Sequence, residues 1–148
     1  MNGRGKEALE LFEQMKQSDM TPDHITLVSV LSACSHAGLV DEGYFHFNCM
    51  REHYHIAPAI EHYVCMVDLL GRAGRLDEAE DLIIGMPIKP DSVVWICLLS
   101  ACRIHNNLHL AKRVAEHIFE LDPENTAPYV LLSNMYATLG RWGYIEKV

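Results

Sequence analysis

The sequence repeats itself about every 32 to 36 residues, and this repetition constrains the fold more than any other feature. Three residues of the first period recur 35 positions later, as Glu7 and Glu42, Phe12 and Phe47, and Met15 and Met50. The string LSAC occurs at 31–34 and again at 99–102. Four prolines lie 36, 32 and 33 residues apart: Pro22, Pro58, Pro90 and Pro123. Units of this length are too small to bury their own apolar faces, so they stack into solenoids.

Each period contains two predicted helices separated by a turn. The first helices follow the prolines, at about 24–36, 60–72, 92–104 and 126–138, and the second at about 41–53, 77–85, 108–120 and from 141 onward. The turns contain residues that tolerate the left-handed conformation that ends a helix: Gly38, Gly74, Asn106, Asn107 and Gly140. Asp41 and Asp77 lie where N-caps are expected. The pattern predicts an all-α fold, a right-handed α-solenoid of eight to nine helices in antiparallel hairpins.

Charge and cysteine content limit the partners and the compartment. The chain has 12 Lys and Arg against 20 Asp and Glu, a net charge of −8. Because nucleic-acid affinity depends largely on phosphate neutralisation, this chain alone is expected to bind nucleic acids poorly. Five cysteines without a C-x-x-C motif favour reduced, buried thiols in a non-secreted protein. No membrane span or signal peptide is visible; Met1 is expected to begin a fragment, with any targeting segment upstream.

Several strings resemble a known family and together cover essentially the whole chain. GKEALELFEQM, ITLVSVLSACSHAGLVDEG and IEHYVCMVDLLGRAGRLDEAEDLI resemble plant pentatricopeptide-repeat (PPR) proteins, in the class whose repeats alternate in length and which edits organellar transcripts. VVWICLLSACRIHNN and YVLLSNMYATLGRW are similar to E-type units, which resemble tetratricopeptide repeats. The resemblance implies an incomplete repeat at 1–23, a long-type repeat at 24–59, a short-type repeat at 60–91, a first E-type unit at 92–125 and a truncated second unit at 126–148.

The resemblance also implies how RNA would be read. In this family each repeat reads one base with the fifth residue of its first helix and the last residue of the repeat, as other helical RNA readers do. The implied pairs are Val28 with Ala59 and Val64 with Asp91, and Asp23 ends the incomplete repeat. Valine side chains cannot hydrogen-bond a base edge, so sequence readout at these positions is weakened. They could still hold a base by van der Waals contact.

The family's role is RNA editing in mitochondria or chloroplasts, and the resemblance carries that expectation to this chain. Single-stranded organellar RNA would be one partner, and a cytidine deaminase domain or accessory editing proteins would be others. The deaminase motifs His-x-Glu and Pro-Cys-x-x-Cys are absent from the sequence, so catalysis is expected from a downstream domain or a separate protein. No metal or cofactor is expected. Four aromatic residues are candidates either for the hairpin core or for a partner-docking surface: Trp95, Tyr129, Tyr136 and Trp142.

Other candidate sites favour structural roles. His105 and His109 flank a turn and are not expected to share a helical face. The histidines at 53, 55 and 62 are expected on a solvated surface, and Cys97 and Cys102 in the core. The acidic charge and the two valines leave an alternative function, a tetratricopeptide-like protein scaffold without RNA contact. The two ends lack capping helices, so the fragment is also expected to self-associate.

Overall fold

The computed structural model describes residues 2–18 and 22–147, with side chains described for 6–18 and 22–140. Every regular element in this part of the chain is an α-helix, which confirms the all-α fold. The helices are α1 (Asn2–Gln17), α2 (His24–Ala37), α3 (Val40–Glu52), α4 (Ile60–Arg72), α5 (Leu76–Ile84), α6 (Ser92–Ile104), α7 (Leu108–Leu121) and α8 (Ala127–Lys147).

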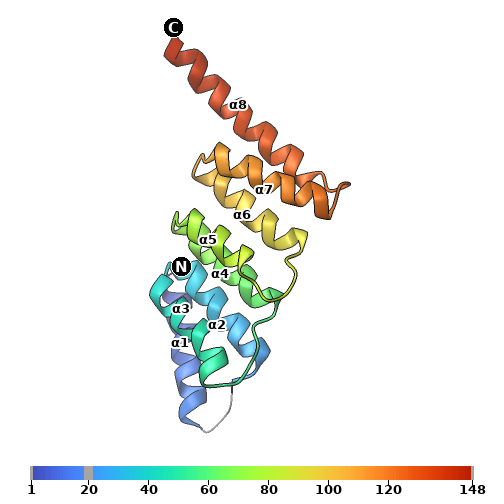
Figure 1. Cartoon of the computed structure of the whole chain (residues 1–148). Helices are drawn as coiled ribbons and strands as arrows, with labels where there is room; N and C mark the ends of the chain where they lie inside the picture. The colour runs from blue at the N-terminus through green and yellow to red at the C-terminus, as the bar shows by residue number, and fades with distance from the viewer. Residues whose placement is uncertain (1, 19–21, 148) are drawn as a thin grey trace.

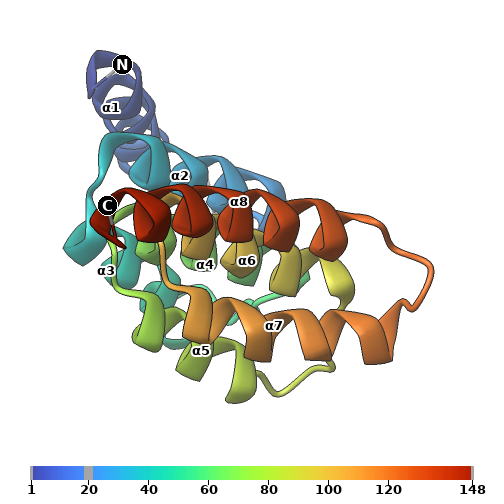
Figure 2. The same ribbon diagram turned by 90° about the horizontal axis from the view of Figure 1, so that it is seen from above.

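The helices stack as hairpins in two layers (Figures 1 and 2). Helices α2, α4, α6 and α8 contact one another in sequence and form the first layer, as the sequence predicts for the apolar helices. Helices α3, α5 and α7 pair with α2, α4 and α6 respectively and form the second layer. Figure 1 shows α1 at one end of the stack and α8 at the other. This arrangement is a helical solenoid, so neighbouring units share one continuous core.

The three hairpin turns share one hydrogen-bonding pattern. Gly38 and Gly74 have φ angles of +72° and +79°, and Asn106 has +57°. The residue after each donates its N–H to the carbonyl five positions back, at 2.9 Å in all three turns: Leu39 to Cys34, Arg75 to Leu70, and Asn107 to Cys102. This is the Schellman arrangement, which closes a helix by one left-handed residue. The predicted turn residues at these three positions are therefore confirmed.

The predicted N-caps are displaced by two residues. Asp41 and Asp77 lie inside the first turns of α3 and α5, whose N-caps are Leu39 and Arg75. The prediction was wrong because the left-handed turn residue is followed by a single linking residue, so the next helix begins earlier than expected. The two carboxylates still face the positive end of the helix dipole and stabilise the helix start.

The predicted break at Gly140 is absent. Helix α8 runs without interruption from Ala127 to Lys147, so the expected second helix from Arg141 is wrong. A single glycine in a helix interior costs only about 1 kcal/mol relative to alanine, which is too little to end a helix by itself. At Gly38 and Gly74 the break is supported by Schellman bonds and by packing of the returning helix on its partner. No comparable bond closes α8 at Gly140 within the described chain.

Close approach of helices requires small residues at two positions. A Cβ on Gly71 of α4 would lie 2.7 Å from the Cβ of Ala101 on α6. A Cβ on Gly43 of α3 would overlap the side chain of Leu69 on α4. These glycines allow neighbouring hairpins to pack closely, with α6 against α4 and α4 against α3. Among the described residues, no helix combines the length and apolarity that crossing a membrane requires.

Candidate nucleic-acid interface

Val28 and Val64 occupy equivalent places on α2 and α4, and both side chains are half-buried. The thiol of Cys65 points at the carbonyl oxygen of Val28 at 3.8 Å, and that of Cys97 points at the carbonyl oxygen of Val64 at 4.0 Å. The same contact therefore joins α4 to α2 and α6 to α4. Burial raises the pKa of Cys65 to about 11 and that of Cys97 to about 12, so both thiols stay protonated and remain hydrogen-bond donors.

The predicted last residues of the repeats begin the first-layer helices. Asp23 is the N-cap of α2, where its Oδ1 accepts from the N–H and the hydroxyl of Thr26, both at 2.8 Å. Asp91 is the N-cap of α6, where its Oδ1 accepts from the N–H of Val94 at 3.1 Å. The backbone bond from Thr26 lowers the pKa of Asp23. Each carboxylate thus has a structural role, and its Oδ2 makes no hydrogen bond to any described residue.

The third of these residues, Ala59, is the N-cap of α4 but has no side-chain acceptor. The imidazole of His62, the third residue of α4, instead accepts from the Ala59 N–H at its Nδ1, 2.9 Å away, which is the reciprocal bond of a capping box. The other ring nitrogen of His62 lies 3.1 Å from the carbonyl oxygen of His24 at the start of α2. Because Nδ1 accepts, Nε2 carries the proton and donates to that carbonyl. His62 is fully buried, so the prediction of a solvated histidine was wrong there, whereas the other two histidines of that prediction, His53 and His55, are exposed.

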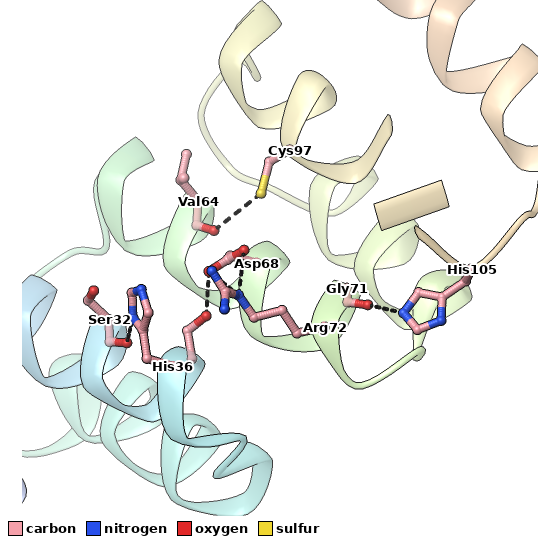
Figure 3. Close-up of polar contacts among 9 residues, drawn as sticks. Ser32, His36, Val64, Asp68, Gly71, Arg72, Cys97 and His105 are labelled. Carbon is pink, nitrogen blue, oxygen red and sulfur yellow. Dashed lines mark hydrogen bonds and ion pairs between the residues drawn. The ribbon is translucent and has the colours of Figure 1, made fainter. Parts of the chain in front are cut away.

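An acidic side chain and a basic one, Asp68 and Arg72, follow Val64 on the same face of α4 (Figure 3). Asp68 accepts from the hydroxyl of Ser35 on α2, and the Nε of Arg72 lies 3.1 Å from both Asp68 oxygens. The terminal nitrogens of Arg72 make no hydrogen bond to any residue whose side chain is described. This pair lines a groove of about 440 Å³, whose residues are Asp68, Arg72, Cys97, Ser100, Ala101 and Ile104. Sequence reasoning missed this cluster, although an acid and an arginine four apart on an apolar helix were a visible signal.

The predicted partner-docking aromatics divide into two groups. Trp95 lies in the hairpin core, the first of its two predicted places, because its side chain is only 4% exposed and stacks on His117 with centroids 4.1 Å apart. Tyr129 and Tyr136 lie seven residues apart on α8 and are 57% and 50% exposed. Tyr129 packs against Phe119, and the ammonium of Lys112 lies 5.6 Å from the Tyr136 ring centroid. The side chain of Trp142 lies outside the described residues.

The remaining sequence candidates have structural contacts. His105 ends α6, and its Nε2 lies 2.8 Å from the carbonyl oxygen of Gly71 (Figure 3), whereas His109 is an exposed residue of α7. Cys102 is fully buried and Cys97 is half-buried. All five cysteines are free. Within the described ranges, no three His, Cys, Asp or Glu side chains come together as a metal site.

Family models match both parts of the chain. A PPR repeat model matches residues 1–20, 25–55 and 61–89, which is more than half of the chain, and an E motif model matches 105–148. A pentatricopeptide repeat-containing protein of Arabidopsis thaliana is 57% identical over 147 residues, which is 99% of this chain and 21% of that protein. A mitochondrial relative of the same plant is 53% identical and the chloroplastic protein DOT4 is 51% identical, each over the whole chain. Those matches cover 22% and 17% of the two relatives.

Among solved structures, the crystal structure of the pentatricopeptide repeat protein PPR10 from maize superposes with a TM-score of 0.73. It is 26% identical in sequence, and the match covers 89% of this chain and 19% of that chain. The chain therefore spans about a fifth of the length of its curated relatives. Relatives named as mitochondrial and chloroplastic confirm the predicted organellar localisation. The chain belongs to the pentatricopeptide-repeat family, in the class whose repeats alternate in length and are followed by E-type units.

Proposed function

We propose that the chain is the C-terminal part of an organellar protein that binds single-stranded RNA, with the first-layer helices facing the RNA. The observation that carries this is the repeated register on α2 and α4. Val28 and Val64 hold equivalent places, and Asp23 and Asp91 begin first-layer helices with one carboxylate oxygen available to a base. In the pair of Val64 with Asp91, the valine would supply van der Waals contact and the aspartate a hydrogen bond, whereas Val28 paired with Ala59 would supply van der Waals contact alone.

Arg72 would contact the RNA backbone in this arrangement. Its Nε is held by Asp68, so the guanidinium is oriented, and its terminal N–H groups point away from that bond. Arginine in such a fork geometry is well suited to phosphate. The division of the chain into an incomplete repeat (1–23), two PPR repeats (24–59 and 60–91) and two E-type units (92–125 and 126–148) forms part of the same proposal.

Photocrosslinking tests the RNA face. Single-stranded RNA carrying 4-thiouridine should crosslink to peptides of α2 and α4, and Arg72→Glu should reduce the yield severalfold. Arg113→Glu is the matched control, since Arg113 is an exposed arginine on α7 that also pairs with a carboxylate, Glu80. Crosslinks concentrated on α3, α5 and α7, or equal losses in both variants, would contradict an RNA-binding first layer.

We further propose that the protein acts as the site-recognition factor for C-to-U editing and that its E-type units recruit or position a cytidine deaminase. The deaminase would follow in the same protein or act in trans, and this chain itself would be non-catalytic. The support is the exposed face of α8, where Tyr129, Val130 and Tyr136 are each at least half exposed. Exposed tyrosines are frequent binding hot spots because they combine apolar area with a polar group.

A binding titration with a cytidine deaminase domain tests this face. Replacing Tyr129 and Tyr136 by serine should weaken binding at least about tenfold, as for a hot spot. Ile84→Ser on α5 removes a side chain that is 64% exposed and serves as the control. The alternative function is a tetratricopeptide-like protein scaffold without RNA contact, which the −8 net charge favours. Deaminase binding without first-layer RNA crosslinks would support that alternative.

A further inference from the structure

A groove of about 590 Å³ lies between α1 and α3, away from the face that α2, α4 and α6 share. Its apolar surface comes from Leu9 on α1 and Phe45 on α3, and Phe45 is 59% exposed. The neighbouring aromatics of α1 and α3, Phe12 and Phe47, are buried. An exposed phenylalanine beside a groove is typical of a binding surface.

His46 lines the same groove and points to a polar ligand. It is only 6% exposed, and its ring packs edge-on against Phe12 at 5.2 Å and Phe45 at 5.4 Å. No described residue makes a hydrogen bond to either ring nitrogen of His46. In the described part of the chain, every side-chain nitrogen or oxygen that is fully enclosed has a hydrogen-bond partner. An unpaired nitrogen of His46 is therefore accessible to solvent, and His46 is one of the residues that line the groove. A polar group of a ligand in the groove can take the place of water at this nitrogen with a hydrogen bond of its own.

The charged side chains around the groove select the sign of that ligand. Glu10, Glu13 and Glu42 line it with one cation, Lys6, and Lys16 pairs with Glu13, so these five groups together leave an excess of one negative charge. Lys16 pairs with Glu13 at 3.0 Å, but Glu10 and Glu42 make no ion pair with a described residue. Burial lowers the pKa of His46, so this ring adds no positive charge near neutral pH. A polyanion such as RNA would be repelled, whereas a cationic segment would be attracted.

We propose that this groove binds a short basic segment of a partner protein, separately from the RNA face. An apolar side chain of the segment would lie over Leu9 and Phe45, and its lysine or arginine side chains would lie beside Glu10 and Glu42. A polar group of the segment would hydrogen-bond His46. Because the groove is built from α1 and α3 alone, the segment and a nucleic acid on α2 and α4 can be bound at the same time.

The test uses a fluorescent peptide of alternating arginine and leucine residues, titrated into the 148-residue chain and followed by anisotropy. Phe45→Ser and Glu42→Lys should each weaken binding about tenfold, the size expected of a hot-spot residue. The matched controls are Ile84→Ser and Asp77→Lys, which change an exposed isoleucine of α5 and an acid in its first turn. Both controls should stay within about twofold of the unchanged chain, since they lie outside the groove.

A second measurement locates the peptide without any substitution. In NMR spectra the imidazole signals of His46 should shift on titration, while those of the exposed His109 should not. Thermal unfolding of each variant confirms that the fold is kept. Equal weakening in groove and control variants, an unshifted His46, or equal binding of a peptide with glutamate in place of arginine would overturn the proposal.

Discussion

Gly38 and Gly74 occupy equivalent left-handed positions but differ in what surrounds them. A Cβ on Gly38 would meet nothing within 4 Å, whereas one on Gly74 would lie 3.5 Å from the ring of His105. Gly38→Ala should therefore cost only the left-handed penalty, about 1–2 kcal/mol. Gly74→Val should cost more, because a β-branched residue is poorly tolerated there and its methyl groups would meet a ring that hydrogen-bonds Gly71. Urea unfolding of both variants measures this, and equal midpoints would contradict it.

His62 makes the joint between α2 and α4 sensitive to acid. Burial lowers its pKa, so the folded state favours the neutral ring. Its stabilisation is complete above the unfolded pKa of about 6.5 and is lost as pH falls from there toward the lowered folded value. Protonation would place two donors, Nδ1–H and the Ala59 N–H, against each other, at a cost of about 1–3 kcal/mol.

Unfolding free energies measured between pH 7.5 and 5 test this joint. The decline toward acid pH should be smaller in His62→Gln, since the substituted residue has no protonation step. His109→Gln removes an exposed histidine of α7 and should keep the original decline. A His62→Gln variant with an unchanged pH profile would show that the acid sensitivity lies elsewhere.

At the scale of the helix, Gly140 and Gly71 should respond to alanine in opposite directions. Gly140 lies inside α8 with nothing near its Cβ position, so Gly140→Ala should stabilise the chain by up to about 1 kcal/mol. Gly71→Ala should destabilise it, because the new Cβ would lie 2.7 Å from Ala101 and push α4 from α6. Thermal melts of the two variants check the signs. A destabilised Gly140→Ala would instead indicate the turn that the sequence suggested.

The helices and turns followed from the sequence wherever local signals agreed. At Gly38 and Gly74 a glycine, a preceding apolar helix and a following amphipathic helix all indicate the same turn, and the structure has it. At Gly140 the glycine and the repeat period indicated a turn, but helix propensity on both sides prevailed. The candidate site was harder to predict, since Trp95 was left open between core and surface and His62 was expected on the surface. Whether an aromatic or histidine is buried depends on which neighbouring helix covers it, and that is a tertiary property.

At the scale of the whole molecule, net charge governs RNA affinity. The chain carries −8, and on the proposed RNA face Arg72 is already paired with Asp68. Few phosphates can be neutralised, so single-stranded RNA should bind the 148-residue chain weakly, with a shallow salt dependence. Filter binding or anisotropy near physiological salt measures this. A submicromolar dissociation constant for any short RNA would mean that contacts other than charge neutralisation dominate.

The two ends of the stack expose apolar side chains of different shape. At one end Leu11 and Ile25 are 65% and 74% exposed beside a groove of about 320 Å³ between α1 and α2. At the other end α8 presents Tyr129, Val130 and Tyr136. Figure 1 places α1 and α8 at opposite ends, so the groove between α1 and α2 and the exposed side chains of α8 cannot meet within one copy.

A contact between two such unlike faces is head-to-tail. A head-to-tail dimer leaves one face free at each end, so further copies can add until a ring closes. Burying a few hundred Å² of apolar surface at about 25 cal/mol per Å² contributes several kcal/mol, enough for association at high concentration. The 148-residue chain should therefore show a mean mass in light scattering that rises beyond the dimer as its concentration approaches about 100 μM. Replacing Leu11 and Ile25 by serine should restore the monomer, because the change removes the apolar side chains from this end. Both side chains are exposed, so the fold should be kept. A chain that stays monomeric over this range would contradict the pairing of the two ends.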